Sequence, residues 1–305
     1  MTTLLTSPTA RRSRTLGRAA RRLAVTLGTT AALTAAAATF ALAAPGDDVT
    51  VVAHRGASAY APENTLAAVR EGVRLRADLV EVDVQRSKDG VLVLVHDTTL
   101  SRTTDVEEVF PGRAPWRVGD FTYAEMQRLD AGSWKAPSFA GERIPTLREA
   151  VFELRRSRAG LLLEVKSPAL YPGIEAEIVA DMRAVPGYVD SAVRADRLVV
   201  QSFDWPSMRT YEALEPTVPV GLLGRPDPAL LPELATWADQ VNPSHRSVDT
   251  AYVQAVHDVG MTSSVYTVNE VADMERAIGL GVDGIITDRP DVLLRVLDGR
   301  ARKAA

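Results

Sequence analysis

The chain is predicted to fold as an α/β protein, because short β-branched runs alternate with helical patterns from Val49 onward. Eight runs take part in this alternation, which is the number of strands in a closed parallel barrel. When the atypical N-terminus of the 305-residue chain is set aside, about 250 residues remain, the length typical of such a barrel. We therefore expect a (β/α)8 TIM barrel with a β-hairpin and a loop insertion after the second strand.

The expected strands alternate with helices whose start signals are readable. In chain order the strands are Val49–His54, Leu79–Val84, Gly160–Lys166, Leu198–Ser202, Val218–Leu223, Asp239–Asn242, Thr262–Val268 and Asp283–Thr287. Thr146 and Glu149 form a capping box that opens one helix. Asp249 is the expected N-cap of another helix, which Gly260 ends.

A ninth β-like run, Val91–His96, does not fit the alternation. Only Gln85–Gly90 separates it from the second strand, which is too short for a parallel crossover. The dipeptide Asp89-Gly90 favours a tight hairpin turn instead.

The hairpin predicts a register. A two-residue loop pairs Lys88 with Val91, and counting along the ladder sets His96 opposite Asp83. The segment 98–145 that follows contains Pro, Gly, Thr and Trp and shows little periodicity. Loops of this length in a compact domain are usually functional or covering elements.

The first 44 residues differ in composition from the rest. They contain six arginines, no lysine and no acidic residue, and their apolar run ends in the small-x-small sequence Ala41-Leu42-Ala43. This pattern is typical of a signal peptide, so we expect residues 1–44 to be cleaved and the protein to be secreted. A retained membrane anchor is the alternative, although the alanine-rich run is only weakly hydrophobic.

The expected organisation follows from this cleavage. Arginine pairs at 11–12 and 21–22 permit the twin-arginine export route beside the Sec route. We expect a linker at 45–48, the barrel domain at 49–298 and a C-terminal tail at 299–305.

The charge and the cysteine content exclude several classes of partner. Without the first 44 residues the chain keeps 29 basic and 39 acidic residues, a net charge of −10. Such a field repels polyanions, so we expect no nucleic-acid partner and, after cleavage, no stable membrane anchor. The chain has no cysteine, which excludes disulfides, thiolate metal sites and a lipid-modified N-terminal cysteine. Nothing in the sequence indicates an oligomeric state.

Charged residues gather at the ends of three expected strands, where the catalytic residues of a TIM barrel lie. The first strand ends in His54 and Arg55, the second carries Glu81 and Asp83, and the third carries Glu164 and Lys166. Alternation puts both members of the second and third pairs on one face of their strands. Carboxylates this close repel one another unless a cation lies among them, and oxygen ligands favour Mg2+ or Ca2+ over zinc. A barrel mouth closed by salt bridges is the alternative, and spacing alone does not decide between the two.

The chain has four histidines, at positions 54, 96, 245 and 257. By the strand and hairpin arguments, His54 and His96 converge on the carboxylates. Two imidazoles beside a metal can take a proton from a nucleophile and give one to a leaving oxygen. His257 lies on an expected helix and is interpreted as structural, whereas His245 follows the sixth strand and could line the barrel mouth.

An ordered set of motifs extends this pattern along the chain. Its first part is His54-Arg55-Gly56, Ala61-Pro62-Glu63-Asn64-Thr65, Glu81-Val82-Asp83-Val84, Lys88-Asp89-Gly90 and His96-Asp97. Its second part is Asp130-Ala131-Gly132, Ile144-Pro145-Thr146-Leu147, Leu163-Glu164-Val165-Lys166, Gln201-Ser202-Phe203, Thr267-Val268-Asn269 and 281–290. The set resembles the glycerophosphodiester phosphodiesterase family, in its secreted bacterial form. Each motif alone is weak, but their order over nearly all of the expected mature chain is specific.

The resemblance implies an activity and a set of roles. The family hydrolyses glycerophosphodiesters, which are small molecules, to glycerol 3-phosphate and an alcohol. Its catalytic histidines correspond to His54, as the base, and His96, as the acid. Its metal ligands correspond to Glu81, Asp83 and Glu164, for a divalent Ca2+ or Mg2+, and its phosphate-contacting residues correspond to Arg55 and Lys166.

Further residues are candidates for substrate binding. Where the family usually has Trp before Thr-Val-Asn, this chain has Tyr266, which keeps an aromatic wall for the glycerol but makes the pocket smaller. Glu63 could reach the metal or Arg55, whereas Asn64 beside it is expected to cap the first helix. Gln201 faces the barrel interior, where it could bind substrate or belong to a polar layer of the core.

Three other functions fit parts of the same pattern. A retaining glycosidase would use paired carboxylates such as Glu81 and Glu164 without a metal, so it would stay active in EDTA. A lyase similar to phosphatidylinositol-specific phospholipases would stop at a cyclic phosphate, which phosphorus NMR detects. A non-catalytic receptor would bind phosphorylated head groups without turnover.

Overall fold

The computed structural model of the chain describes residues 49–304. The predicted signal peptide (1–44) and linker (45–48) lie outside the described residues. Eight parallel strands overlap the eight expected runs. They are β1 (Thr50–Ala53), β2 (Leu79–Arg86), β4 (Gly160–Val165), β5 (Leu198–Ser202), β6 (Val220–Leu223), β7 (Gln240–Asn242), β8 (Ser264–Val265) and β9 (Gly284–Thr287).

The strands form one parallel sheet that closes on itself. Its order is β7-β6-β5-β4-β2-β1-β9-β8. The two end strands meet through the backbone, because Val241 N–H donates to the Thr262 carbonyl at 2.9 Å and His245 N–H donates to the Tyr266 carbonyl at 2.9 Å. The prediction of a (β/α)8 barrel is confirmed.

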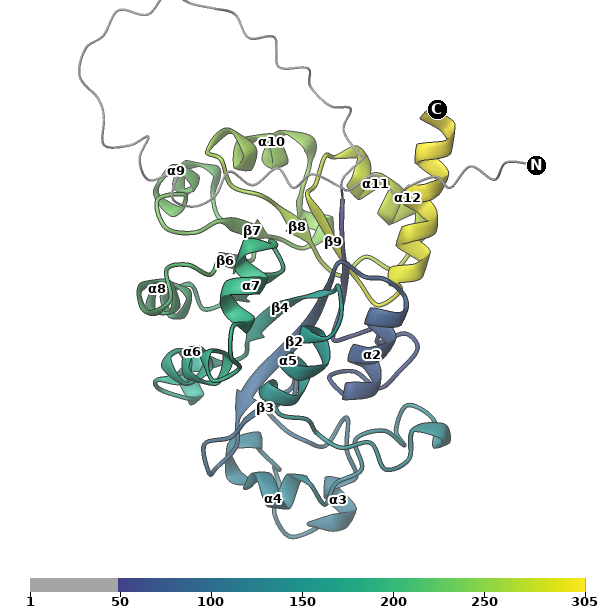
Figure 1. Cartoon of the computed structure of the whole chain (residues 1–305), viewed down its shortest axis with the longest axis vertical. Helices are drawn as coiled ribbons and strands as arrows, with labels where there is room; N and C mark the ends of the chain where they lie inside the picture. The colour runs from purple at the N-terminus through teal and green to yellow at the C-terminus, as the bar shows by residue number, and fades with distance from the viewer. Residues whose placement is uncertain (1–48, 305) are drawn as a thin grey trace, which may run out of the picture. The chain divides into compact units, whose positions relative to one another are not determined.

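Helices cover the outside of the strands (Figure 1). They are α2 (Leu66–Arg74), α5 (Leu147–Arg155), α6 (Ile174–Arg183), α7 (Tyr188–Arg194), α8 (Trp205–Leu214), α9 (Leu231–Leu234), α10 (Thr250–Asp258), α11 (Val271–Gly279) and α12 (Pro290–Ala304). Short 3-10 turns lie at Pro168–Leu170, Pro228–Leu230 and His245–Ser247. Across residues 49–304, no helix combines the length and the apolar character that a membrane span requires.

The ends of three helices test the sequence-based boundaries. The Thr146 and Glu149 capping box opens α5, and the Asp249 carboxylate caps α10, both as predicted. The last helix, α12, runs from Pro290 to Ala304 and so crosses residue 298, the predicted boundary between the barrel domain and the C-terminal tail.

Strand alternation separates two apolar cores. The larger core lies between the strands and the surrounding helices. The smaller one lies on the inward strand faces and consists of Val52, Leu79, Leu162, Val199 and Ile286. Glu81 and Asp83 follow Leu79 on the same face of β2, and Glu164 follows Leu162 on β4. Strand geometry therefore carries these carboxylates into the barrel interior, on the C-terminal side of the smaller core.

The extra strand β3 (Leu92–Leu94) pairs antiparallel with β2. The predicted register is wrong by one residue, because Val84 lies opposite Leu94 and the Asp83 carbonyl accepts from Val95 rather than facing His96. The cause is a loop of three residues, 88–90, in place of two. Ser87 opens this loop, and its hydroxyl accepts from the Val91 N–H at 2.9 Å.

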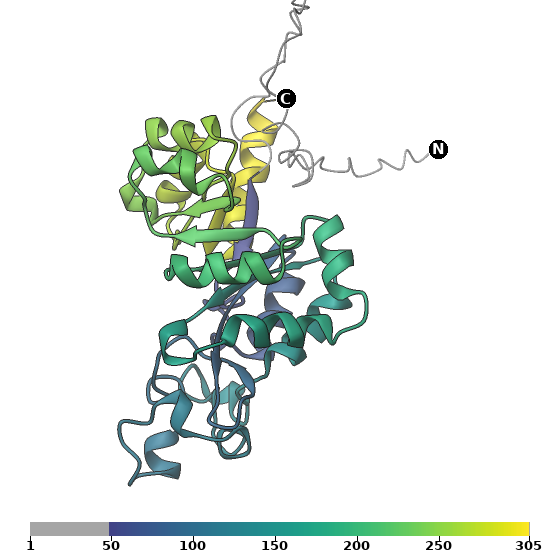
Figure 2. The ribbon, with the colours of Figure 1, turned by 90° about the vertical axis from the view of Figure 1, so that its left-hand side faces the viewer.

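The insertion after β3 has an apolar core of its own. It contains α3 (Val106–Val109), α4 (Tyr123–Met126) and 3-10 turns at Val118–Asp120 and Pro137–Phe139. Its core joins β3 to the insertion through the buried residues Val93, Val95, Leu100, Val106, Val118, Phe121, Met126, Leu129, Ala131 and Ile144. Figures 1 and 2 show α3 and α4 beyond the C-terminal end of β2, away from the helices that surround the strands. The segment is thus a packed covering element on the side where the charged strand ends lie.

Candidate active site

The acidic residues at the ends of β2 and β4 form one cluster. Asp83 lies opposite Glu164 in the parallel ladder, and Glu81 precedes Asp83 on the same face. One carboxylate oxygen from each residue lies within 4.8 Å of the other two. The exposed fractions of the residues are 1% for Glu81, 1% for Asp83 and 8% for Glu164. The structure therefore brings the three predicted metal ligands together in a largely buried cluster.

The negative charge of this cluster is not fully compensated by its neighbours. Glu81 Oε1 and Asp83 Oδ1 are buried and have no hydrogen-bond partner among the described residues. Burial, and then the carboxylates of Asp83 and Glu164, raise the pKa of Glu81 well above its usual range. Burial and Asp83 raise the pKa of Glu164 to about 7. A cation among these oxygens would remove both the repulsion and the missing contacts.

Arg55 and Lys166 neutralise part of the negative charge. Arg55 Nε lies 3.5 Å from Asp83 Oδ2, and the Arg55 N–H donates to Glu81 Oε2 at 2.6 Å. Lys166 Nζ donates to Glu164 Oε1 at 2.6 Å and lies 3.7 Å from Asp83 Oδ1. The alternative of a salt-bridged barrel mouth is therefore realised in part. Glu81 Oε1 and Asp83 Oδ1 still accept no hydrogen bond among the described residues, so this all-oxygen donor set fits a hard divalent cation such as Mg2+ or Ca2+.

The turn after β1 aims the backbone of Arg55 at this cluster. Arg55 has a left-handed φ of 52°, and Gly56 follows with a φ of 79°. A Cβ on Gly56 would lie 2.5 Å from the Ala68 backbone in α2, so only glycine allows the turn to pack this closely. The Gly56 N–H also donates to the Glu81 carbonyl at 3.0 Å. The turn thereby fixes the Arg55 N–H on the Glu81 carboxylate.

His54 is held by a carboxylate that is distant in the sequence but adjacent in the fold. Its Nδ1 lies 2.7 Å from Asp288 Oδ1, which also accepts from the Ser58 hydroxyl at 2.8 Å. The Asn269 amide donates to Asp288 Oδ2 at 2.6 Å. Burial alone would raise the pKa of Asp288, but the hydrogen bonds from His54, Ser58 and Asn269 outweigh it and hold the pKa at about 2. An ionised Asp288 favours the proton on Nδ1, which leaves Nε2 of His54 for chemistry.

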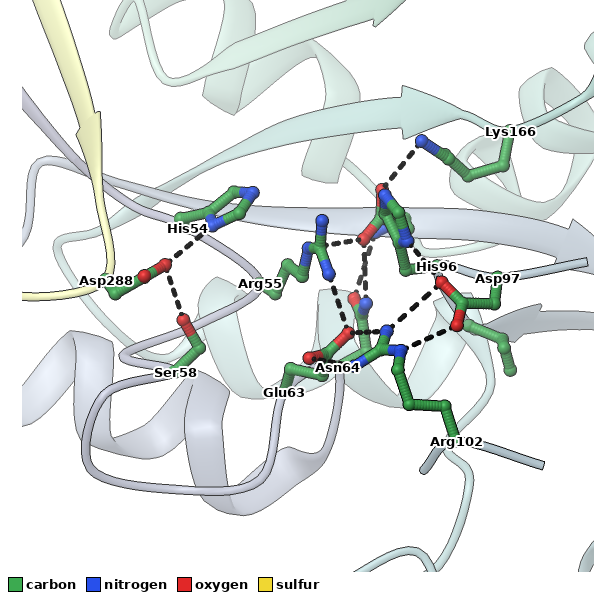
Figure 3. A network of polar contacts seen from close by, with 12 residues as sticks. His54, Arg55, Ser58, Glu63, Asn64, His96, Asp97, Arg102, Lys166 and Asp288 are labelled. Atoms are coloured by element: carbon green, nitrogen blue, oxygen red, sulfur yellow. Dashed lines mark hydrogen bonds and ion pairs between the residues drawn. The ribbon is translucent and has the colours of Figure 1, made fainter. Parts of the chain in front are cut away.

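His96 is held by its neighbour in the sequence. Its Nδ1 lies 2.6 Å from Asp97 Oδ1, and Asp97 Oδ2 accepts from Arg102 Nε at 2.6 Å. Burial lowers the pKa of His96, and the nearby Arg55 contributes in the same direction. Figure 3 shows His54 and His96 on opposite sides of Arg55.

Although the predicted hairpin register is wrong by one residue, His96 still lies at the site. His96 lies beyond the last paired residue of β3, where the chain has left the ladder, so strand alternation no longer fixes the direction of its side chain. The carboxylate of Asp83 still acts electrostatically on the imidazole.

Glu63 reaches Arg55, one of its two predicted partners, whereas the prediction that Asn64 caps the first helix is wrong. Glu63 Oε1 accepts from Arg55 Nη1 at 2.8 Å and from Arg102 Nη2 at 2.7 Å. Asn64 does not cap the first helix, because the Thr65 hydroxyl accepts from Ala68 N–H and is the N-cap of α2. The Asn64 amide instead donates to Asp83 Oδ2 at 2.8 Å, and the Asp83 N–H donates back to Asn64 Oδ1 at 3.0 Å. Asn64 thus fixes the orientation of a candidate metal ligand.

Gln201 lies on β5, and Tyr266 directly follows β8. Gln201, opposite Glu164 on β5, accepts from the buried Asn242 amide at 2.8 Å, so it belongs to a polar layer of the core. The ring of Tyr266 meets the ring of Phe203 edge-on, with centroids 5.9 Å apart. Phe203 is 55% exposed, and the centroid of its ring lies 5.8 Å from Lys166 Nζ. An aromatic pair, one ring exposed and the other half-buried, therefore lies next to the charged cluster.

The other two histidines lie outside the cluster. His257 Nε2 lies 2.7 Å from Asp283 Oδ2, where it joins α10 to the start of β9, so its structural interpretation fits. His245 is buried after β7, and its ring faces Arg276 and Asp273 of α11. It therefore does not line the site.

Sequence reasoning missed Asp288, Asp97 and Arg102. Asp288 directly follows β9, so the strand-end signal that identified the other residues also applied to it. Asp97 follows a singled-out histidine in the sequence. No sequence pattern pointed to Arg102. Its partners are Glu63, in the loop between β1 and α2, and Asp97, after the hairpin.

Comparisons with known proteins agree with this geometry. Residues 54–292 match the sequence model of the glycerophosphoryl diester phosphodiesterase family. A glycerophosphodiester phosphodiesterase of Caldanaerobacter subterraneus subsp. tengcongensis is 39% identical over 252 residues, which cover 81% of this chain and 97% of the relative. One from Bacillus subtilis is 34% identical over 267 residues, which cover 83% and 88%.

A solved structure extends the likeness to three dimensions. An Oleispira antarctica phosphodiesterase in complex with the product sn-glycerol-3-phosphate has a TM-score of 0.73 and 29% sequence identity, and the match covers 82% of this chain and 97% of that one. With the family match over 54–292 and a relative at 39% identity, the chain belongs to the glycerophosphodiester phosphodiesterase family of enzymes.

Proposed function

We propose that this enzyme hydrolyses glycerophosphodiesters to glycerol 3-phosphate and an alcohol, with a divalent cation held by Glu81, Asp83 and Glu164. The observation that carries the proposal is the buried carboxylate cluster, two of whose oxygens accept no hydrogen bond among the described residues. A histidine whose Nδ1 is held by an aspartate lies to either side of Arg55 beside that cluster.

Positive charge at the site matches the charge of a phosphodiester. Arg55 presents a planar guanidinium and Lys166 an ammonium, both next to the carboxylates. When bound, Mg2+ or Ca2+ would supply Lewis-acid polarisation of the phosphoryl oxygens. Arg55 and Lys166 would stabilise the charge that grows on these oxygens in the transition state.

The two histidines divide the proton transfers. His54 takes the proton from the attacking oxygen as a new P–O bond forms. His96 gives a proton to the alkoxide as the bond from phosphorus to the alcohol breaks. One imidazole cannot do both at once, which is why two are needed on different elements. Asp288 favours the tautomer of His54 with its proton on Nδ1, so that Nε2 can accept a proton, and Asp97 orients His96, whose imidazolium form supplies the proton to the alkoxide.

The aromatic pair of Phe203 and Tyr266 suits the carbon skeleton of the substrate. A relative is described with the product sn-glycerol-3-phosphate, and we propose the same product here. The exposed ring of Phe203 and the half-buried ring of Tyr266 offer an apolar edge beside Lys166. They would pack against the glycerol carbons while the basic residues hold the phosphate.

The test is an assay of the protein, stripped with EDTA and reconstituted with Mg2+ or Ca2+. It would be incubated with glycerophosphocholine, glycerophosphoethanolamine, glycerophosphoglycerol and glycerophosphoinositol, and release of glycerol 3-phosphate would be followed. We expect turnover of at least one diester that EDTA abolishes and the metal restores. Full activity in EDTA would overturn the metal-dependent proposal and favour paired-carboxylate chemistry.

Product analysis separates hydrolysis from lyase chemistry. Phosphorus NMR of the same reactions should show glycerol 3-phosphate accumulating as the final product. A cyclic phosphate that persists after the substrate is consumed would mean that the enzyme stops at cyclisation. Binding of a diester without any turnover, with metal present, would mean a receptor.

We also propose that the enzyme is exported and of the secreted bacterial type. The basic segment, the apolar run and the small-x-small sequence of residues 1–44 support cleavage near Ala44. The mature protein would be a soluble secreted enzyme without nucleic-acid partners, consistent with its net charge of −10. N-terminal sequencing of exported protein is the test, and retention of the arginine-rich segment would contradict it.

A further inference from the structure

One arginine of the insertion holds residues on both sides of the site. Arg102 Nε donates to Asp97 Oδ2 at 2.6 Å, and Nη2 lies 3.1 Å from Asp97 Oδ1. The same guanidinium donates to Glu63 through Nη1 at 2.9 Å and Nη2 at 2.7 Å. Arg102 therefore binds two carboxylates with two contacts each (Figure 3).

Each of these carboxylates holds a residue with a proposed role in chemistry. Asp97 accepts from Nδ1 of His96, and Glu63 accepts from the guanidinium of Arg55. Arg102 itself contacts no member of the acidic cluster in any hydrogen bond or ion pair of the described chain. Its direct contacts with the site are those to Asp97 and Glu63.

The side chain of Arg102 is 44% exposed, whereas the next residue, Thr103, packs against the site. Thr103 lines a cavity of about 10 Å3 together with Glu63, His96, Ala131 and other residues, which is too small for more than a single water. The insertion behind it has its own buried core. Arg102 thus connects the insertion to Glu63, in the loop between β1 and α2, and to Asp97, which follows the hairpin.

We infer that Arg102 is a positioning residue, which orients the proton donor His96 through Asp97 and the phosphate-binding Arg55 through Glu63. The inference rests on the proposed function and deepens it. It assigns to the insertion the task of completing the active site, in addition to covering it.

The electrostatics of the contact agree with this role. The hydrogen bonds from Arg102 are the largest cause that holds the pKa of Asp97 at about 2. Burial would raise the pKa of Glu63, but Arg102 and Arg55 together lower it. Without Arg102, Asp97 would be free to rotate away from His96, and Glu63 would turn to Arg55 alone. Planar bidentate contacts of this kind need the guanidinium fork, which lysine lacks.

The first test is a double-mutant cycle between Arg102 and Asp97 on the metal-loaded enzyme. Arg102→Gln and Asp97→Asn should each lower kcat about ten-fold, the range expected when the partner of an active-site histidine is removed. Because Arg102 acts through Asp97, the double variant should lose little more than the worse single variant. Fully additive losses would show that Arg102 acts independently of Asp97 and would overturn the inference.

The second test compares leaving groups. Glycerophosphocholine releases an alkoxide that needs protonation, whereas the p-nitrophenyl ester of glycerol 3-phosphate releases a stable phenolate. Arg102→Gln should change the ratio of kcat on the two substrates in the same direction as His96→Ala does. An equal loss on both substrates, while His96→Ala distinguishes them, would reduce Arg102 to a structural role.

A matched control comes from the same insertion. Arg113 pairs with Glu125 at 2.5 Å and donates to the Asp120 carbonyl, away from either histidine. Arg113→Gln should lower Tm but leave the leaving-group ratio at its wild-type value. Arg102→Lys keeps the charge and should fall between wild type and Arg102→Gln, which keeps the inference testable if the latter does not fold. An inactive wild type would refute the proposed function, whereas an active wild type with a fully active Arg102→Gln would refute only this inference.

Discussion

The two candidate catalytic histidines are held in the same way but by different parts of the molecule. Nδ1 of His54 lies 2.7 Å from Asp288, and Nδ1 of His96 lies 2.6 Å from Asp97. Asp288 receives its other hydrogen bonds from neutral groups of the barrel, Ser58 and Asn269. Asp97 receives its other contacts from a charged group of the insertion, Arg102.

The difference shows how the two halves of the site are assembled. The His54 pair joins residues 234 positions apart, so it forms only when β9 pairs with β1 and the barrel closes. The His96 pair joins adjacent residues, so its two members are always near each other, and the insertion must fix their orientation. Barrel closure therefore makes one half of the site, and docking of the insertion makes the other.

The largest expected effect separates the roles of the two histidines. His54→Ala and His96→Ala should each lower kcat/KM by about 100- to 10,000-fold on glycerophosphocholine, the usual worth of general acid or base catalysis. On the p-nitrophenyl ester, replacing the acid should cost far less, whereas replacing the base should cost the same. Equal losses on both substrates for both variants would mean that the histidines do not divide the proton transfers.

The carboxylate cluster interacts with the surroundings of both pairs, because Glu81 accepts from the backbone of Arg55, next to His54, and Asp83 acts electrostatically on His96, so its loss should affect both. Glu81→Ala, Asp83→Ala and Glu164→Ala should each lower activity by roughly 100-fold or more, as expected for losing Lewis-acid stabilisation. Each folded variant should also bind Mg2+ or Ca2+ more weakly in calorimetry. Wild-type metal affinity in all three would falsify the ligand assignment, and glutamine or asparagine variants serve as size-matched controls.

The pair of His54 and Asp288 can be tested by replacing Asp288. Asp288→Asn keeps the size of the side chain but no longer favours the proton on Nδ1 of His54, so kcat/KM should fall by about 10- to 100-fold. Ser58→Ala removes only one neutral donor to Asp288 and should cost much less. Wild-type kinetics for Asp288→Asn would show that His54 does not depend on this carboxylate.

Arg55 lies between the two pairs, and the expected effect of changing it is smaller. Arg55→Lys keeps the charge but loses the planar fork that can contact two phosphate oxygens and Glu63. Loss of one charge-assisted hydrogen bond, worth about 1.5–3 kcal/mol, corresponds to a decrease of about ten-fold or more in kcat/KM. An unchanged kcat/KM would place Arg55 outside the phosphate site.

The smallest effect is on stability at acid pH. The pKa of Asp288 is about 2 in the folded protein, against about 3.9 for an unfolded aspartate. A lowered pKa contributes stability that is present above the unfolded value and is lost as the pH falls from about 4 toward 2. The Tm difference between wild type and Asp288→Asn should therefore shrink over this range, and thermal unfolding followed by circular dichroism would measure it.

The salt dependence of Tm should distinguish the Asp97 pair from the Asp288 pair. Asp97 also has a pKa of about 2, but it owes this first to the charged Arg102. Added salt should reduce the Tm difference between wild type and Asp97→Asn more than that for Asp288→Asn, because salt screens exposed ion pairs more than hydrogen bonds to neutral groups. An equal salt response would mean that the two pairs are held by the same kind of force.

The sequence by itself determined the barrel and most of the strand-end residues. Each strand repeats with a period of two, and parallel strands bring their C-terminal ends to one side, so the eight runs placed Arg55, Glu81, Asp83, Glu164 and Lys166 together. Capping signals at Thr146 and Asp249 fixed helix starts for the same local reason. These features depend on neighbours within a few residues along the chain.

Only the tertiary structure decided the contacts that orient these residues. Asp288 reaches His54 through barrel closure, Asn64 turns from a cap to a partner of Asp83, and the hairpin shifts by one residue around Ser87. Arg102 meets Glu63 and Asp97 only when the insertion packs against the β1 loop. A pattern along the chain specifies which face a side chain occupies. It does not specify which of several polar side chains on that face is its partner, because that depends on distances between elements that are set only by packing.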